Sequence, residues 1–144
     1  MIPLARVHEA DNYLIYSLKK RVWAIFEYKL EALVSATRII MNLPLKSEIQ
    51  ATLQTYLNQE SDEIPTQIKE ACIEIALALA DGIDPEMEYR QLTKTTQGYS
   101  SLRQQKNTEM VEEYLAMGIP SLAAWKLLIP YLKLSRSVAL ERVS

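Results

Sequence analysis

The sequence predicts a mainly α-helical protein: a small helical bundle around one central, buried helix, with a possible β-hairpin arm and an extended C-terminal tail. The chain has 144 residues, of which 49% are hydrophobic and 24% are charged, as in an ordinary globular protein of one domain. It contains only 3 glycines, which disfavours a turn-rich all-β fold. Apolar residues recur at helical spacing over most of the circumference of residues 64–82.

Residues 64–82 are expected to form the central helix. Pro65 suits the first helical turn, and Gly82 suits the position just past the end of the helix. Ile73, Leu77 and Ala80 widen the apolar face, and such a helix is covered by neighbours on several sides. The face itself has the spacing i, i+3, i+4, i+7, i+8 and i+11 and consists of Ile68, Ala71, Cys72, Ile75, Ala76 and Leu79.

Four further helices are expected around the central one. Pro44 ends the second of them, because proline cannot continue a helix without losing a hydrogen bond. Pro130 kinks or ends the last one. The apolar spacing predicts these helices over residues 5–18, 21–43 and 47–57 and from residue 121 onward.

The segment 86–117 is consistent with two structures. The Glu, Met, Leu and Ala content near its end favours a helix. Met110, Glu112 and Tyr114 alternate with their neighbours, as in a strand. Both interpretations stay open from the residues alone.

The sequence shows no group of residues typical of catalysis or of metal binding. His8 is the only histidine, and no cysteine or carboxylate set lies around it at ligand spacing. Cys72, the only cysteine, lies on the apolar helix face and is interpreted as a small buried hydrophobe. The carboxylates of residues 58–63 lack the glycine and the alternating spacing of a calcium loop. We therefore expect a protein that is not an enzyme and that binds no cofactor or metal.

Charge and hydropathy limit the partners further. The net charge is −2, so no overall positive field attracts nucleic acid. The N-terminal residues lack a basic region followed by an apolar run, so no signal peptide is expected. No apolar run approaches the ~20 residues that cross a bilayer. The expectation is a soluble, cytosolic product without a membrane partner.

Four segments carry patterns that occur together in one known family. They are EADNYL (9–14), KLEALVSATRIIMNL (29–43, preceded by Trp23), IPTQIKEACIEIALALADG (64–82) and IPSLAAWKLLIPYL (119–132). In this order, they resemble the head-to-tail connector (adaptor) proteins of tailed bacteriophages, a family that includes DnaT-like single-stranded-DNA-binding proteins. The second segment resembles the ALI-ATR-LD helix of that family, the third its VP-x-x-VK-A-x-x-ELA helix and the fourth its closing P-x-x-x-x-LL-PYL segment.

The resemblance implies a structural virion protein of the neck, present in the host cytoplasm during assembly. Such adaptors form a ring, commonly of twelve copies, and contact the portal protein on one side and a tail terminator or neck protein on the other. Double-stranded DNA passes through the ring without sequence-specific binding, and a mildly acidic chain suits a channel that does not hold phosphate. The implied organisation is an adaptor domain over residues 1–132, with a hairpin arm at about 91–117, and a docking tail over residues 133–144.

Two sets of contact residues follow from this organisation. The arm is expected to contact a neighbouring subunit, and the tail is expected to dock on the portal through apolar anchors and steering charges. The arm residues are Tyr99, Leu102, Arg103, Met110 and Tyr114, and the tail residues are Tyr131, Leu132, Leu134, Arg136, Val138, Leu140 and Arg142.

Two alternative functions remain open from the sequence. One is single-stranded-DNA binding, in which aromatic side chains stack on bases beside cations. The other is a generic helical interaction module that stays monomeric or dimeric. The stacking residues of the first alternative are Trp23, Tyr28 and Tyr99, and its cations are Lys19, Lys20, Arg21, Arg90, Lys94 and Arg103.

Overall fold

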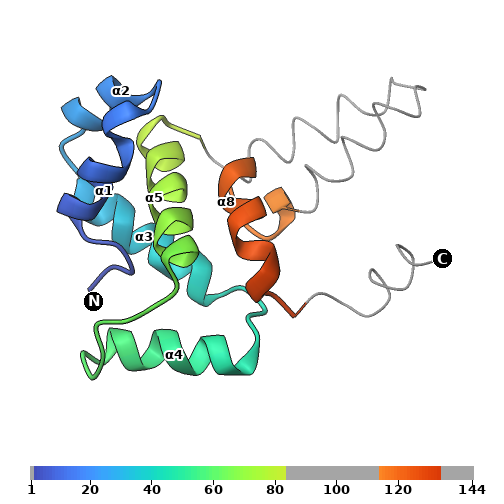
Figure 1. Ribbon diagram of the computed structural model, residues 1–144. Helices are drawn as coiled ribbons and strands as arrows, with labels where there is room; N and C mark the ends of the chain where they lie inside the picture. The colour runs from blue at the N-terminus through green and yellow to red at the C-terminus, as the bar shows by residue number, and fades with distance from the viewer. Residues whose placement is uncertain (1, 84–113, 134–144) are drawn as a thin grey trace, which may run out of the picture.

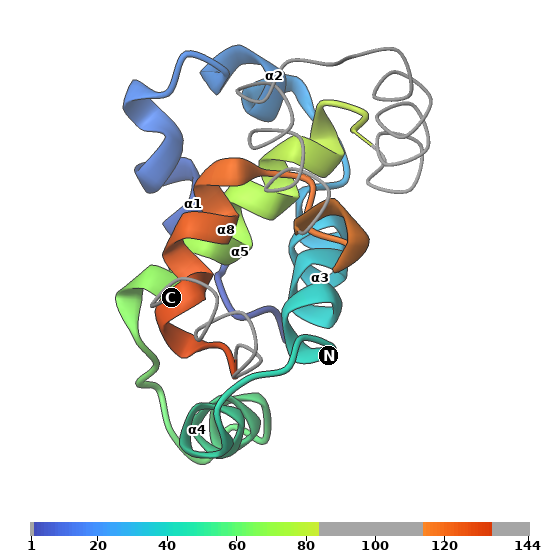
Figure 2. The same ribbon diagram turned by 90° about the vertical axis from the view of Figure 1, so that its right-hand side faces the viewer.

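The helix Thr66–Ala80 (α5) lies at the centre of the computed structural model, which describes residues 2–83 and 114–133. It packs against α3 (Lys29–Met41) on one side and against α8 (Leu122–Leu128) on the other (Figure 1). Figure 2 shows the same three helices from the side of α8, with α4 (Ser47–Leu57) set apart at one end. The protein is therefore mainly α-helical, with a bundle built around one helix, as the sequence predicts.

The expected apolar face of α5 is the centre of the core. Ile68, Ala71, Cys72, Ile75 and Ala76 are all fully buried, and Leu79, the last member of the face, is partly buried. Pro65 is the residue just before the first turn of α5, so its missing N–H does not remove a helical hydrogen bond. The burial confirms that neighbouring helices cover α5 on more than one side.

The first expected helix, over residues 5–18, is shorter than predicted. An α-helix covers Val7–Tyr13 (α1), and a 3₁₀ turn, Leu14–Tyr16 (η1), follows it. The backbone becomes extended at Ser17, and Leu18 is fully exposed instead of continuing the apolar line. The expectation of one continuous helix over residues 5–18 was wrong.

The second expected helix, over residues 21–43, is two helices. Lys20–Ile25 (α2) ends at an extended Phe26, and α3 begins after Tyr28. In one continuous helix, Trp23 would lie about 80° around the axis from Leu33. The break turns α2, so that Trp23 and Leu33 both enter the core, with 2% and 0% of their surface exposed.

Helix α4 and the last helix agree with their predicted ranges. In α4, Leu53 and Tyr56 are buried. Helix α8 begins after Ser121, whose hydroxyl accepts a hydrogen bond from the backbone N–H of Ala124 at 3.3 Å. The helix ends before Pro130, which lies in a 3₁₀ turn, Ile129–Tyr131 (η2).

The end of the described chain is joined to the turn before α4. Leu132 forms an antiparallel bridge with Leu45, and the backbone N–H of Lys46 donates to the carbonyl of Tyr131 at 2.9 Å. Leu132 is only 3% exposed, so this junction belongs to the core. The turn at residues 43–46 therefore holds α8 in place on α5.

A single hydroxyl fixes the N-terminal segment to the bundle. The Oγ1 atom of Thr37 accepts a hydrogen bond from the backbone N–H of Leu4 at 2.8 Å and donates one to the carbonyl of Leu33 at 2.8 Å. Its distance to the Sγ atom of Cys72 is 3.7 Å. Thr37 is the only fully buried polar residue in the part of the chain that the structure describes.

Only the end of the expected arm is described. Residues 114–116 are helical, and Gly118 follows with a φ angle of 83°. This agrees with the helical interpretation for those residues, while the hairpin expectation for residues 91–113 lies outside the described residues. The described ranges contain no strand beyond the single bridge at Leu45.

Three helices of the described ranges are followed by a residue whose backbone has a positive, left-handed φ angle. These residues are Gln59, Gly82 and Gly118, so one of them is not glycine. After α5, the N–H groups of Gly82 and Ile83 return to the carbonyls of Leu79 and Ala78, which satisfies the last turn of the helix. After α4, the same pattern places Gln59 at a φ angle of 64°. A residue with a Cβ atom in this conformation costs roughly 1–2 kcal/mol.

We expect Gln59→Gly to raise the free energy of unfolding by about 0.5–1 kcal/mol, because glycine removes this strain and loses only part of the gain to the entropy of the unfolded chain. Urea unfolding followed by circular dichroism measures the change. Asn58→Gly is the matched control, because Asn58 has an ordinary φ angle of −80° and should give no gain. Equal effects of the two substitutions would contradict the prediction.

Candidate interaction surface

Large hydrophobic side chains are exposed in one short part of the described chain. In residues 2–83 and 114–133, every exposed side chain of this kind falls between positions 13 and 30, at the end where α1, η1, α2 and the start of α3 meet (Figure 1). We call this set the apolar belt. It consists of Tyr13 (39% exposed), Ile15 (47%), Tyr16 (94%), Leu18 (104%), Ile25 (82%), Tyr28 (60%) and Leu30 (50%).

The orientation of α2 follows from how Trp23 is held. The indole Nε1 of Trp23 donates a hydrogen bond to Oδ1 of Asp11 at 2.8 Å, and the Nζ atom of Lys29 lies 3.2 Å from the same oxygen. The Lys29 ammonium also lies 5.7 Å from the centre of the indole ring. Residues two apart on a helix point to opposite sides. With Trp23 fixed inward, Ile25 must therefore point outward.

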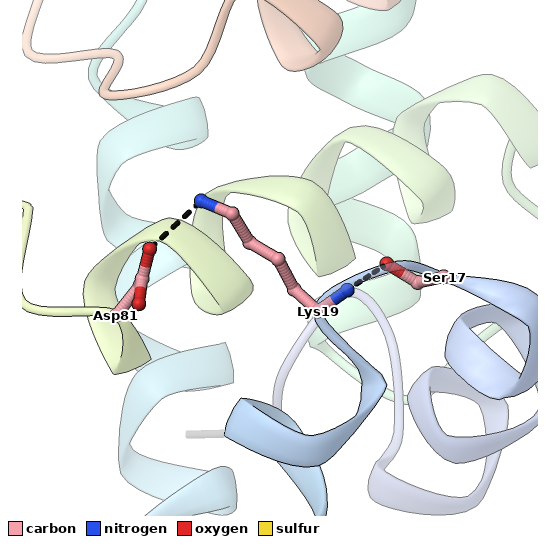
Figure 3. Close-up of polar contacts among 3 residues, drawn as sticks. All are labelled: Ser17, Lys19 and Asp81. Carbon is pink, nitrogen blue, oxygen red and sulfur yellow. Dashed lines mark hydrogen bonds and ion pairs between the residues drawn. The ribbon is translucent and has the colours of Figure 1, made fainter.

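Three cations follow one another at the start of α2. The Nζ atom of Lys19 forms an ion pair with Asp81 at 2.7 Å, and its backbone N–H donates to the hydroxyl of Ser17 at 3.1 Å (Figure 3). Lys20 and Arg21 are exposed, and neither has an ion pair within the described residues. Cations at the first turn of α2 oppose its helix dipole, so α2 itself does not account for their position.

A cleft of about 490 Å³ lies beside the belt, between the Ser17–Lys19 turn, the last part of α5 and Pro120. Its walls include Leu18, Leu77 and Pro120, and Glu74 also lines it. Burial raises the pKa of Glu74 above its ordinary value and nearby Glu70 adds to this, whereas Lys19 acts in the opposite direction. The cleft is thus an apolar hollow with one half-buried carboxyl group.

The reactive groups of the described residues do not form a catalytic site. Cys72 is fully buried, and burial raises the pKa of its thiol to about 11, so it stays protonated near neutral pH. His8 lines a second cleft of about 220 Å³, where Lys69 donates a hydrogen bond to Glu9 at 2.8 Å. No group of three or more metal-ligating side chains occurs in residues 2–83 and 114–133.

The pKa of Glu9 is lowered. Burial acts to raise it, but the hydrogen bond from Lys69, the backbone hydrogen bond from Arg6 and the charges of Lys69 and His8 together outweigh that effect. The carboxylate of Glu9 thus holds the start of α1 against α5. The same cleft is also lined by Arg6, Tyr56 and Asp62.

The predicted contact residues lie largely outside the described part of the chain. In the arm, Tyr114 is described: it is 9% exposed and its ring centre lies 6.4 Å from that of Trp125. In the tail, Leu132 is buried and Tyr131 donates a hydrogen bond from its hydroxyl to Gln67. These side chains pack within the bundle, so Tyr114 and Leu132 are core residues in this structure. Outside the described residues lie Tyr99, Leu102, Arg103, Met110, Leu134, Arg136, Val138, Leu140 and Arg142.

Of the expected stacking residues for single-stranded DNA, the structure describes Trp23 and Tyr28. Trp23 is 2% exposed and packs inward, so its ring has no free face for a base. Tyr28 is 60% exposed, and of the cations in the described ranges Lys19 is paired with Asp81. Outside the described ranges lie Tyr99, Arg90, Lys94 and Arg103.

Sequence reasoning assigned the belt residues to helix faces and therefore missed the belt. One signal was present: the segment 14–30 holds more large apolar residues than one helix face can bury. The Lys-Lys-Arg run at positions 19–21, named above only as a set of cations for the single-stranded-DNA alternative, lies within the same surface.

No described helix has the length and apolarity needed to cross a bilayer. Comparisons with protein-family models, with characterised proteins and with solved structures found no match for this chain.

Proposed function

We propose that this protein is a structural assembly subunit, namely an adaptor that forms a ring of twelve copies between the portal and the tail of a bacteriophage particle. The observation that carries the proposal is the apolar belt. Monomeric proteins rarely expose a large apolar patch, and patches of this kind mark interaction surfaces. With roughly 200 Å² for each fully exposed large side chain, the belt offers on the order of 900 Å². One partner in a stable interface buries about 800 Å².

Two further observations support the adaptor over other assembly proteins. The four segments that resemble the connector family occur in the family's order and extend to position 132. The net charge of −2 suits a channel wall that DNA passes without being held. Portal docking through the tail and neighbour contacts through the arm remain part of this proposal.

Self-association of the purified protein tests the first part of the proposal. We expect the full chain to form oligomers in light scattering and rings in electron micrographs. Tyr16→Ser/Leu18→Ser/Ile25→Ser should weaken association at least tenfold without loss of the fold, because all three side chains are exposed. Ala51→Ser/Ala123→Ser, at exposed alanines of α4 and α8, is the matched control and should leave association unchanged.

A full chain that stays monomeric at high concentration would contradict the ring. The virion role has its own test: mass spectrometry of purified particles that encode this chain should detect it, and its absence from them would reject the adaptor assignment. Salt-dependent binding to single-stranded oligonucleotides by a chain that does not associate would instead support the DnaT-like alternative.

A further inference from the structure

Unpaired positive charge gathers at one end of the central helix. The ion pair between Lys19 and Asp81 fixes the start of α2 beside the C-terminal end of α5 (Figure 3). Lys20 and Arg21 follow, exposed and without an ion pair in the described residues. Of the four cations in the stretch 13–31, Lys19 and Lys29 are paired with Asp81 and Asp11, so the unpaired positive charge is that of Lys20 and Arg21 at the start of α2.

Unpaired negative charge gathers at the other end of the same helix. The loop 58–65 joins α4 to the N-terminal end of α5 and carries Glu60, Asp62 and Glu63, all exposed. With Glu48 on α4, residues 47–65 hold four carboxylates and no lysine or arginine. None of these carboxylates has an ion pair within the described part of the chain. We call residues 47–65 the acidic end.

The two charged regions cannot neutralise each other within one molecule. Helix α5 separates them, and its 15 residues span about 22 Å (Figure 1). Charges in solution are screened over about 8–10 Å at ordinary salt concentration. Carboxylates before α5 and cations after it suit the dipole of that helix, but the dipole does not explain why large apolar side chains are exposed among the cations.

We propose that the apolar belt of one copy docks on the acidic end of the next copy, so that subunits meet head to tail along the direction of α5. This inference rests on the self-association proposed above and names the two surfaces that meet. Lys20 and Arg21 would face the carboxylates of the loop 58–65, while Leu57 and Ile64, which are only partly buried there, offer apolar contact.

A head-to-tail contact uses two different surfaces and therefore repeats into a ring or a filament, whereas a belt-to-belt contact stops at a dimer. A belt-to-belt contact would also place the unpaired Lys20 and Arg21 of both copies at one interface, away from the carboxylates of the acidic end. The charge distribution thus favours the contact that a ring requires.

Complementary charge reversal tests the inference. Lys20→Glu/Arg21→Glu removes the positive surface, and Asp62→Lys/Glu63→Lys removes the negative one. Each variant alone should associate at least tenfold more weakly than the unchanged chain. Mixed in equal amounts, the two variants should recover mixed oligomers, because the two unchanged surfaces attract each other and the two reversed surfaces also carry opposite charges. A chain with all four reversals should associate again for the second of these reasons. Arg38→Glu/Lys126→Glu, at exposed cations of α3 and α8, is the matched control.

Light scattering distinguishes the possible outcomes. If the unchanged chain is monomeric, the proposed function fails. If it associates while Asp62→Lys/Glu63→Lys associates equally well, the proposed function stands and the head-to-tail contact is overturned in favour of belt-to-belt contact. If both variants lose association but their mixture does not recover it, the two surfaces do not meet and the inference is overturned.

Discussion

Trp125→Ala is expected to lower the free energy of unfolding by about 3–5 kcal/mol. Trp125 is 2% exposed, lies on the face of α8 that packs against α5, and has the ring of Tyr114 beside it at 6.4 Å between centres. Alanine would leave a cavity that two helices and their neighbours can close only in part. Urea unfolding followed by circular dichroism at equilibrium measures the loss.

Two controls make the result specific to this cavity. Trp125→Phe keeps an aromatic ring in place and should lose clearly less. Lys126→Ala, at the next position and exposed to solvent, should change the free energy of unfolding by less than about 0.5 kcal/mol. A loss below about 1 kcal/mol for Trp125→Ala would show that α8 is not held on α5 as described.

The second large effect is expected for Thr37→Val, which should cost about 1–3 kcal/mol. Valine has nearly the same shape as threonine but cannot accept the hydrogen bond from the backbone N–H of Leu4, which is buried. An unsatisfied buried donor carries its full desolvation cost. The first residues of the chain should then detach, and hydrogen exchange at Leu4 measures this directly.

Thr37→Ser is the informative companion variant. Serine keeps the hydroxyl that bonds to Leu4 and Leu33, so the N–H of Leu4 should stay protected even though the lost methyl group lowers stability somewhat. If the serine and valine variants exposed Leu4 to exchange equally, the hydroxyl would not be what holds the N-terminal segment.

The elements that sequence reasoning placed correctly have strong local signals. Helix α5 carries an apolar pattern over twelve positions, from Ile68 to Leu79, and a glycine just past its end that adopts a φ angle of 83°. Helix α4 lies between Pro44 and a polar loop. In each case, the residues that set the boundary are adjacent in sequence to the element that they end.

The breaks near Ser17 and Phe26 have no such signal. No glycine or proline occurs between positions 5 and 43, and the apolar spacing continues across both breaks. Tertiary contacts end these helices. The indole of Trp23 donates a hydrogen bond to Asp11 on α1, and the changed direction of α2 allows both Trp23 and Leu33 to be buried. Contacts between distant positions outweigh local propensity, and one sequence does not reveal them.

The candidate surface was missed for the same reason. The exposure of Ile25 can be inferred only when Trp23 is known to point into the core. The exposure of Leu18 can be inferred only when the first helical segment is known to end at Tyr16. Burial of Leu132 likewise depends on its bridge to Leu45, which precedes α5 in the chain, whereas Leu132 follows α5. Arm and tail residues were chosen from the resemblance, and the residues of the belt were not among them.

The bridge between Leu45 and Leu132 has a consequence for synthesis on the ribosome. The ribosome synthesises α1 to α5 before α8. Until α8 has been made, the face of α5 that α8 covers in the folded protein lacks that cover. During that interval, the growing chain is a client for chaperones and a target for proteases. Messages truncated before codon 122 would therefore yield chains that lack α8 and leave that flank of α5 uncovered.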